Sequence, residues 1–103
     1  MATQRREVIW TLRARDALDE AAAHIAEDSL EAAADFVERA LDAAESLDTL
    51  SERGHIVPEL EIPSVRELFI DKYRLIYEVS PSQVTVVGVL HGARDFNQWW
   101  RGE

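Results

Sequence analysis

The chain has 103 residues, which fits one folded domain, expected here to span residues 1–103. Hydrophobic residues make up 47% of the chain and charged residues 30%, a composition that argues against a disordered protein. The absence of cysteine excludes disulfides, thiolate metal sites and cysteine nucleophiles. The first residues lack the apolar run of a secretory signal, and no segment has the roughly 18 apolar residues of a membrane span. We therefore expect a cytoplasmic protein with no membrane partner.

The net charge of −9 is unevenly distributed along the chain. Residues 16–52 contain twelve acidic residues and one basic residue, Arg39. Residues 63–101 contain five basic and four acidic residues. Because contacts with a phosphate backbone need clustered lysine and arginine, we expect no direct DNA binding by this chain alone.

The N-terminal part of the chain predicts a strand followed by a helix. Residues 7–11 are mainly β-branched or aromatic, which favours a first strand. Thr11 offers an N-cap oxygen to the alanine-rich segment that follows it. Ala14, Leu18 and Ile25 recur there at helical spacing, so the pattern indicates an amphipathic helix that ends near Asp28.

A second helix is predicted from Asp28 to about Leu50. Asp28 and Glu31 resemble a capping box with aspartate as the cap. The apolar stripe expected to face the core comprises Leu30, Ala33, Val37, Leu41, Ala44 and Leu47, widened by Phe36 and Ala40. The acidic residues expected on the opposite side are Glu31, Asp35, Glu38, Asp42 and Glu45. The two helices should form a hairpin with an acidic outer surface.

The second half of the chain predicts a three-stranded antiparallel meander. Gly54 is expected to end the second helix, and the proline-bracketed residues 57–63 should form a loop or an edge segment. Three β-type runs, the last of them apolar on both faces like an interior strand, span residues 64–70, 73–79 and 83–91. The order predicts an α+β fold: an N-terminal strand, a helical hairpin and the meander, with the hairpin packed on one face of the sheet.

No metal or cofactor site is expected. His24, His55 and His91 lack close ligand spacing, and the acidic residues follow the period of a helix surface. Arginines beside aromatic residues could form a nucleic-acid platform, but the sequence has neither a basic stripe nor an RNA-binding motif.

Five segments, taken in order, resemble a known family. They are VIWT at 8–11, ARDALDEAAAHIA at 14–26, the helix through Phe36 and Leu41, VRELFIDKYRLIYEV at 65–79, and VLHGARD at 89–95. Together they resemble the RelE/ParE superfamily of toxins from type II toxin-antitoxin modules, over residues 7–96. The resemblance implies a small cytoplasmic toxin of a plasmid-stabilisation system that inhibits growth and is held inactive by the C-terminal segment of a cognate antitoxin.

The expected fold fits such a partner. An edge strand permits strand addition, and a helical hairpin offers a groove for a helix. The acidic outer surface suits a basic inhibitor segment, although it is also what a solvated helix side looks like. The assemblies to consider are a toxin-antitoxin heterotetramer and a homodimer formed by the edge strand and the tail.

The superfamily contains two functional classes. RelE-like members cleave messenger RNA on the ribosome, whereas ParE-like members are regarded as poisons of DNA gyrase without established catalytic residues. RNA cleavage through the 2′-hydroxyl requires a base, an acid and a cation that stabilises the phosphate charge. Arg74 and Arg94 stand where RelE-like proteins carry phosphate-binding arginines, and His91 is of the residue type that titrates near neutrality. These three are the catalytic candidates of the nuclease alternative.

Three departures favour the ParE-like class. The middle strands carry few basic residues, and the net charge opposes approach to a phosphate-rich ribosomal site. The late tyrosine of RelE-like sites matches the region of Trp99 and Trp100, whose indoles cannot transfer a proton in catalysis. We therefore expect a toxin that inhibits DNA gyrase by direct binding and is not an enzyme. A RelE-type endoribonuclease and an inactive family member are the alternatives.

Six residues are expected to bind the target or the antitoxin. One of the two tryptophans should stay exposed, as interface anchors do, because both cannot easily be buried near a chain terminus. The six residues are Arg66, Arg74, Arg94, Phe96, Trp99 and Trp100.

The same residues also have structural interpretations. His91 could be a hydrogen-bonded residue at a strand end, and Gly92 could permit a turn or a close backbone approach. Arg94 could pair with Asp95. Arg74 could form a cross-strand ion pair with one of three carboxylates. These are Glu67, Glu78 and Asp95.

Overall fold

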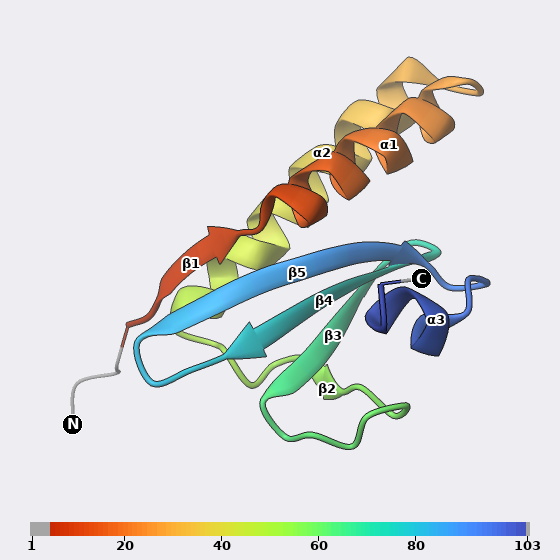
Figure 1. Cartoon of the computed structure of the whole chain (residues 1–103). Helices are drawn as coiled ribbons and strands as arrows, with labels where there is room; N and C mark the ends of the chain where they lie inside the picture. The colour runs from red at the N-terminus through yellow and green to blue at the C-terminus, as the bar shows by residue number, and fades with distance from the viewer. Residues whose placement is uncertain (1–4, 103) are drawn as a thin grey trace.

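The computed structural model describes residues 5–102 (Figure 1). Met1 to Gln4 and Glu103 lie outside the described residues. The expected 1–103 domain, the first residues that were expected to lack a secretory signal, and the end of the aromatic tail therefore extend beyond the described range. In chain order the elements are β1 (Glu7–Trp10), α1 (Leu12–Ala26), α2 (Leu30–Glu45), the 3-10 turn η1 (Ser46–Asp48), β2 (His55–Ile56), β3 (Val65–Ile70), β4 (Tyr73–Val79), β5 (Gln83–His91) and α3 (Phe96–Trp100).

The strands form a 5-stranded sheet in the order β1-β5-β4-β3-β2. β1 runs parallel to β5, with Val8 in register with Val84, and the other neighbouring strands are antiparallel. β5 therefore lies inside the sheet, as its apolar residues predict. The α+β class, the N-terminal strand, the helical hairpin and the meander are confirmed, and the structure adds the short edge strand β2.

The two faces of the sheet carry different covers (Figure 1). On the helix face, Leu75 and Tyr77 join α1 and α2 in the larger core. On the opposite face, called here the α3 face, Ile76 packs with Phe96 and Trp99 of α3. Because consecutive side chains of a strand point to opposite faces, β3, β4 and β5 contribute to both cores.

The start of α1 is as predicted. Thr11 has an extended backbone, and its Oγ1 accepts a hydrogen bond of 3.0 Å from the backbone N–H of Ala14. This bond satisfies one of the N–H groups that a helix start leaves without a partner. Ala14 and Leu18 of α1 are buried, so α1 turns its small apolar side chains toward the core.

The predicted cap of α2 was wrong by one residue. Ser29 has the extended backbone of an N-cap, and its Oγ accepts from the backbone N–H of Ala32 at 3.1 Å. Asp28 instead belongs to the turn, where its backbone N–H donates to the Ile25 carbonyl. A serine adjacent to the aspartate offers an equally good capping oxygen, and the turn selects it.

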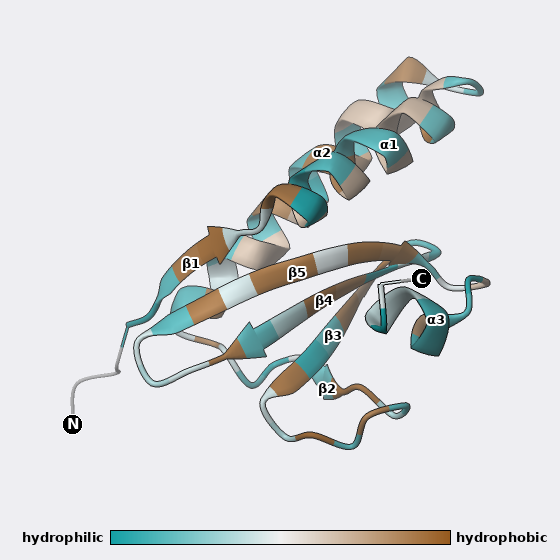
Figure 2. Cartoon of the chain, in the orientation of Figure 1, coloured by the Kyte–Doolittle hydropathy of each residue, from teal (hydrophilic) through white to brown (hydrophobic). Residues whose placement is uncertain are grey.

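The apolar stripe predicted for α2 was only partly right. Leu30 is 79% exposed, because it begins α2 at the free end of the hairpin, which projects beyond the sheet. Leu41 is 47% exposed, because it lies at the side of α2 that borders a cavity next to β1. Figure 2 shows hydrophobic residues at the free end of the hairpin. α2 also ends at Glu45 and continues as η1, so the helix stops before Leu50. The buried residues of α2 and η1 are Ala33, Phe36, Ala40, Ala44 and Leu47.

Gly54 does not end the second helix, which was the expectation for it. It lies next to β2, where its backbone N–H donates to the Tyr77 hydroxyl at 3.0 Å. A β-carbon on Gly54 would lie 2.6 Å from the Glu67 carbonyl oxygen. The glycine is therefore needed for a close approach of the loop to β3 and β4.

None of the helices within residues 5–102 is long and apolar enough to cross a membrane.

Candidate functional site

Two of the three catalytic candidates of the nuclease alternative, Arg74 and His91, are separated by the sheet. Arg74 on β4 is paired in register with Leu90, and Tyr73 is paired with His91. Arg74 points to the α3 face, where its guanidinium lies 4.8 Å from the Phe96 ring centroid. His91 points to the helix face, where its ring lies 5.2 Å from the Tyr73 ring. Neighbouring registers on the same two strands thus place the arginine and the histidine on opposite faces.

Arg74 is held between two carboxylates. Its Nε donates to Glu67 at 2.6 Å, and its two terminal nitrogens donate to the carboxylate oxygens of Glu59 at 2.9 and 2.7 Å. Only 6% of the Arg74 surface is exposed. The cross-strand ion pair with Glu67 was among the structural interpretations, whereas Glu59, in the loop before β3, was missed. Glu78 and Asp95 form no ion pair with Arg74.

These contacts neutralise the charge of Arg74. The hydrogen bonds with Glu59 raise the pKa of Arg74 and lower the pKa of Glu59, because each stabilises the charged form of the other. With two carboxylates around one guanidinium, the cluster carries an excess negative charge. An RNA phosphate would have to displace a bidentate carboxylate and approach this negative charge.

His91 lies at an exposed strand end. Its Nδ1 accepts a hydrogen bond of 3.1 Å from the backbone N–H of Ala93, which stabilises the turn after β5. Gly92 follows, and its backbone N–H donates to the Lys72 carbonyl at 2.8 Å. A β-carbon on Gly92 would come within 3.2 Å of that carbonyl oxygen, so the glycine allows a close approach of two turns.

The aromatic tail forms α3 and packs against the α3 face. Trp99 is only 4% exposed, and it occupies space that a side chain at Gly88 would fill. Trp100 is 37% exposed and stacks on Phe96, with ring centroids 5.8 Å apart. One tryptophan is therefore buried and the other is partly exposed, as the sequence predicts.

Arg94 lies beside Trp99 but does not pair with Asp95. Asp95 is instead the N-cap of α3, and its Oδ1 accepts from the backbone N–H of Gln98 at 3.1 Å. Arg94, Trp99 and Arg13 of α1 line one cleft of about 430 Å³. The guanidinium of Arg13 lies 4.6 Å from the Trp99 ring centroid, and its Nη2 donates to the Trp99 carbonyl at 2.8 Å.

The six residues predicted to bind partners do not form one site. Arg74, Phe96 and Trp100 form one contiguous group, and Arg94 and Trp99 line the cleft beside it. Arg66 lies apart, because its guanidinium donates to backbone carbonyls of the loops before β2 and β3. Arg13 was not among the residues predicted from the sequence, since 86 positions separate it from Trp99 and no local pattern links the two.

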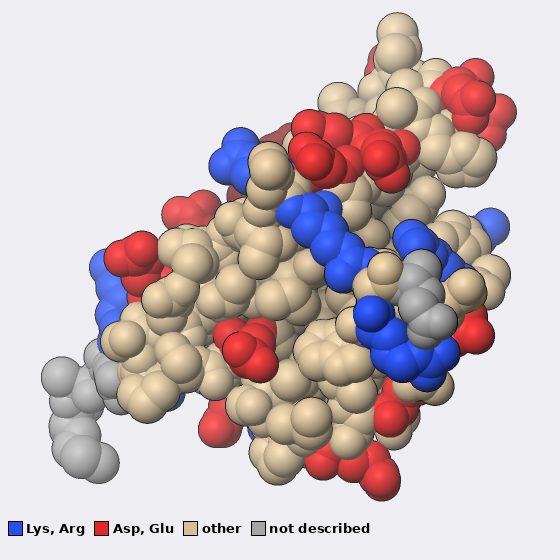
Figure 3. Space-filling view, viewed as in Figure 1, with Lys and Arg blue, Asp and Glu red and all other residues tan. Residues whose placement is uncertain are grey.

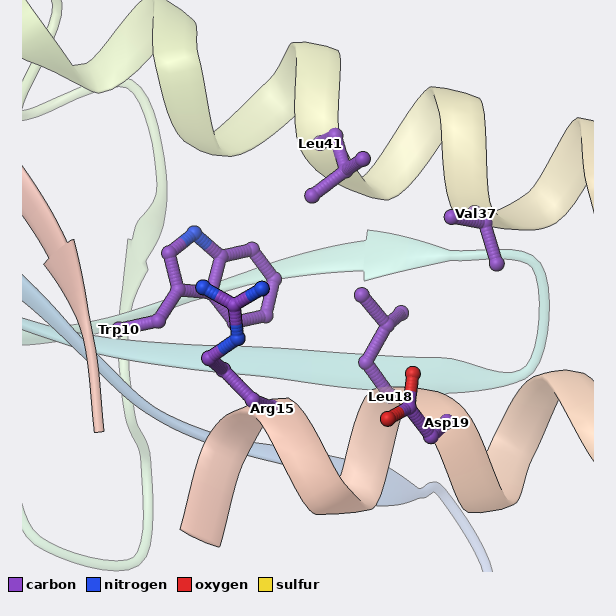
Figure 4. Close-up of a pocket in the computed structure, with 6 residues that line it drawn as sticks. All are labelled: Trp10, Arg15, Leu18, Asp19, Val37 and Leu41. Carbon is purple, nitrogen blue, oxygen red and sulfur yellow. The ribbon is translucent and has the colours of Figure 1, made fainter. Parts of the chain in front are cut away.

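A second cavity lies between the helices of the hairpin, next to β1 (Figure 4). Its volume is about 240 Å³. Trp10 of β1, Leu18 of α1, and Val37 and Leu41 of α2 provide its apolar walls, with two charged residues of α1 at its rim. The exposure of Leu41 contradicts its predicted place in the core but makes it accessible from this cavity. The charged residues at the rim are Arg15 and Asp19.

The charges of the molecule are separated in space. Figure 3 shows acidic side chains along the hairpin and basic side chains gathered around α3 and the start of α1. Within residues 5–102, no group of three or more histidine or acidic side chains is placed to hold a metal ion. Two of the accessible features are a surface next to α3 that carries basic side chains and an apolar cavity in the hairpin.

Comparison with known proteins identifies the family. Residues 8–96 match the family described as the ParE toxin of the type II toxin-antitoxin system, parDE. No curated protein matches the chain. The fold is similar to that of a chain in the chromosomal ParDE toxin-antitoxin system from P. aeruginosa, with a TM-score of 0.69 and 20% identity over 85% of this chain and 97% of that one.

A second solved structure supports the same fold. It is the toxin-antitoxin complex RelBE2 from Mycobacterium tuberculosis, in which one chain matches with a TM-score of 0.56 and 22% identity over 90% of this chain and 98% of that one. Since the family match covers nearly all of the strands and helices described above, this chain belongs to the ParE toxin family of type II toxin-antitoxin systems.

Proposed function

We propose that this chain is a toxin that is neutralised by a cognate antitoxin and that inhibits DNA gyrase by binding to it, without catalysis. The observation that carries this proposal is the separation of Arg74 and His91 on opposite faces of the sheet. Cleavage at one RNA phosphate needs the base, the acid and the stabilising cation around that phosphate, each within hydrogen-bond reach of the atom on which it acts. A single RNA phosphate cannot contact both residues in this fold.

The state of Arg74 supports the same conclusion. A cation that stabilises a phosphorane must keep its donors available to the developing charge. Three nitrogens of Arg74 are already engaged by Glu59 and Glu67. Arg74 therefore holds the loop and α3 on the sheet, and this structural role supports action through binding by surface residues.

An antitoxin partner is supported by the hairpin cavity and the edge strand beside it. β1 is at the edge of the sheet, so its outer side is open to strand addition. The cavity next to it is lined by Trp10, Leu18, Val37 and Leu41, which would accept an apolar side chain. Asp19 and Arg15 stand at its rim, on a hairpin whose helices are rich in acidic residues, so the inhibitor segment should combine apolar anchors with basic residues.

Induced expression in the absence of the antitoxin tests the mode of action. We expect growth arrest with gyrase-trapped DNA breaks, and we expect His91→Ala to arrest growth to the same extent because His91 is exposed and has no proposed role in binding. Messenger RNA cuts on translating ribosomes that disappear in His91→Ala would overturn the proposal in favour of the nuclease. Normal growth with a folded, abundant protein would indicate an inactive family member.

Leu41→Asp tests the antitoxin site. The substitution places a carboxylate at the mouth of an apolar cavity in an already acidic hairpin, so we expect antitoxin affinity to fall by about tenfold or more while growth arrest persists. Leu30→Asp is the matched control, because Leu30 is also an exposed leucine of α2 but does not line the cavity. Equal antitoxin affinity of the two variants, measured by calorimetry on proteins with unchanged circular dichroism, would contradict this placement.

A further inference from the structure

Most arginines of this acidic chain are engaged by its own oxygen atoms. Arg39 and Arg74 each pair with two carboxylates, and Arg66 donates to backbone carbonyls. Arg94 differs from them, because its exposed side chain makes no hydrogen bond or ion pair with another residue in the range 5–102. All five of its N–H donors are thus available to a partner, as judged from the described part of the chain.

Arg94 stands at a cleft that has a defined shape. The cleft lies between the start of α1 and the turn before α3, and its volume is about 430 Å³. Trp99 and Leu12 give it apolar surface. Arg13 is fixed beside Arg94 by its stacking on Trp99 and by its hydrogen bond to the Trp99 carbonyl. Because that bond uses one of its five donors, Arg13 can also bind an anionic group.

The α1 wall of the cleft also carries acidic residues. Asp16 and Glu20 line it, one helical turn apart, on the same side of α1 as Arg13. A nucleic-acid backbone carries a phosphate at every nucleotide and would place negative charge against these carboxylates. A protein segment can instead direct one aspartate or glutamate to the arginines and place uncharged or basic side chains beside the carboxylates. The charge pattern therefore favours a protein partner over a nucleic acid.

We propose that the cleft lined by Arg94, Arg13 and Trp99 binds an acidic segment of the toxin's protein target. This inference rests on the proposed function, since it assigns a surface and a chemistry to the contact with gyrase. Basic side chains gather around α3 and the start of α1 in a chain of net charge −9, so an acidic partner meets less repulsion there than along the hairpin (Figure 3). The exposed Leu12 would supply the apolar part of the contact, and the buried Trp99 would hold Arg13 in place beneath it.

Charge reversal at Arg94 tests the assignment. Arg94→Glu removes no contact between described residues, so the variant should fold like the wild type and bind the antitoxin with unchanged affinity. We expect its affinity for purified DNA gyrase, measured by surface plasmon resonance without DNA, to fall by about tenfold or more. The wild-type affinity should also fall as sodium chloride is raised. The control is Arg53→Glu, an equal charge change in the loop before β2, which should stay within about twofold of the wild type.

The outcomes separate the inference from the proposed function. Gyrase binding by the wild type with equal affinity for Arg94→Glu overturns the inference alone. If the wild type does not bind gyrase, the proposed target is wrong, and growth arrest then tests the cleft. Arrest that is lost in Arg94→Glu and kept in Arg53→Glu supports the cleft as the target surface. Equal arrest by the two variants overturns it. Binding of the wild type to duplex DNA that depends on Arg94 overturns the choice of a protein partner.

Discussion

Gly88 and Trp99 show how a single glycine positions the aromatic tail. A β-carbon at Gly88 would overlap the Trp99 ring, so the indole reaches the sheet only because the side chain there is a hydrogen atom. Trp99 in turn receives Arg13 from α1, which joins the tail to the hairpin across the molecule. The position of α3, and with it the cleft beside Arg94, therefore depends on this glycine.

Gly88→Ala should destabilise the fold by about 1–3 kcal/mol, because an extra methyl group in a filled site forces its neighbours to move. Urea unfolding followed by circular dichroism measures this effect. In a Trp99→Leu background the same substitution should cost clearly less, since the clash has been removed. Additive effects of the two substitutions would contradict the packing described here.

Some of these residue contacts could be predicted and others could not. Cross-strand pairing follows from strand register, so the Arg74–Glu67 pair was among the expectations. Glu59 lies in an irregular loop and Arg13 contacts a residue 86 positions away, so neither contact is encoded in a local pattern. The separation of Arg74 from His91 was missed because it depends on the register between β4 and β5. This register decides to which face of the sheet each side chain points.

At the scale of elements, the loop before β3 is attached to the sheet by an ion pair. Glu59 reaches from this loop to Arg74, which also lies under Phe96 of α3. The loop, β4 and α3 therefore share one arginine. The hydrogen bonds from Arg74 hold the pKa of Glu59 below its ordinary value of 4.5.

A pH dependence follows from this lowered pKa. A carboxyl group whose pKa is lower in the folded than in the unfolded chain contributes stability above its ordinary value, and this contribution is lost as the pH falls through the folded value. The free energy of unfolding should therefore fall in acid below about pH 4.5, with about 1 kcal/mol from Glu59. Glu59→Gln should lower the stability at pH 7 and flatten this dependence.

Glu61→Gln is the control for this measurement, because Glu61 is an exposed carboxylate of the same loop without an ion pair to any residue in the described range. Urea unfolding at pH 7 and below pH 4.5 compares the variants. A Glu59→Gln variant with the acid dependence of the wild type would show that the ion pair does not stabilise the loop.

The helices illustrate what a hydrophobic pattern can and cannot predict. Their existence, their order and the acidic side of α2 followed from residue spacing. The buried side of α2 is centred on Phe36, Ala40 and Ala44, and apolar spacing alone does not say which of the adjoining apolar positions face the sheet. Leu30 and Leu41 are apolar but exposed, and Leu41 borders the cavity next to β1.

At the scale of the whole molecule, opposite charges mark two surfaces. The acidic hairpin with its apolar cavity suits a basic inhibitor segment, and the cationic surface at α3 suits an acidic target. Two separate surfaces would allow variants that lose one partner and keep the other. Leu41→Asp and Arg94→Glu should therefore have opposite effects, the first weakening antitoxin binding and the second weakening target binding.

We propose above that this toxin acts by binding to DNA gyrase and not by catalysis. The most direct test is a supercoiling assay with purified gyrase, relaxed plasmid and increasing amounts of the purified chain. We expect inhibition of supercoiling that rises with the ratio of toxin to gyrase. The same inhibition is expected for His91→Ala, and the antitoxin should reverse it. Full gyrase activity at a large excess of toxin, together with messenger RNA cleavage in a translating extract, would contradict it.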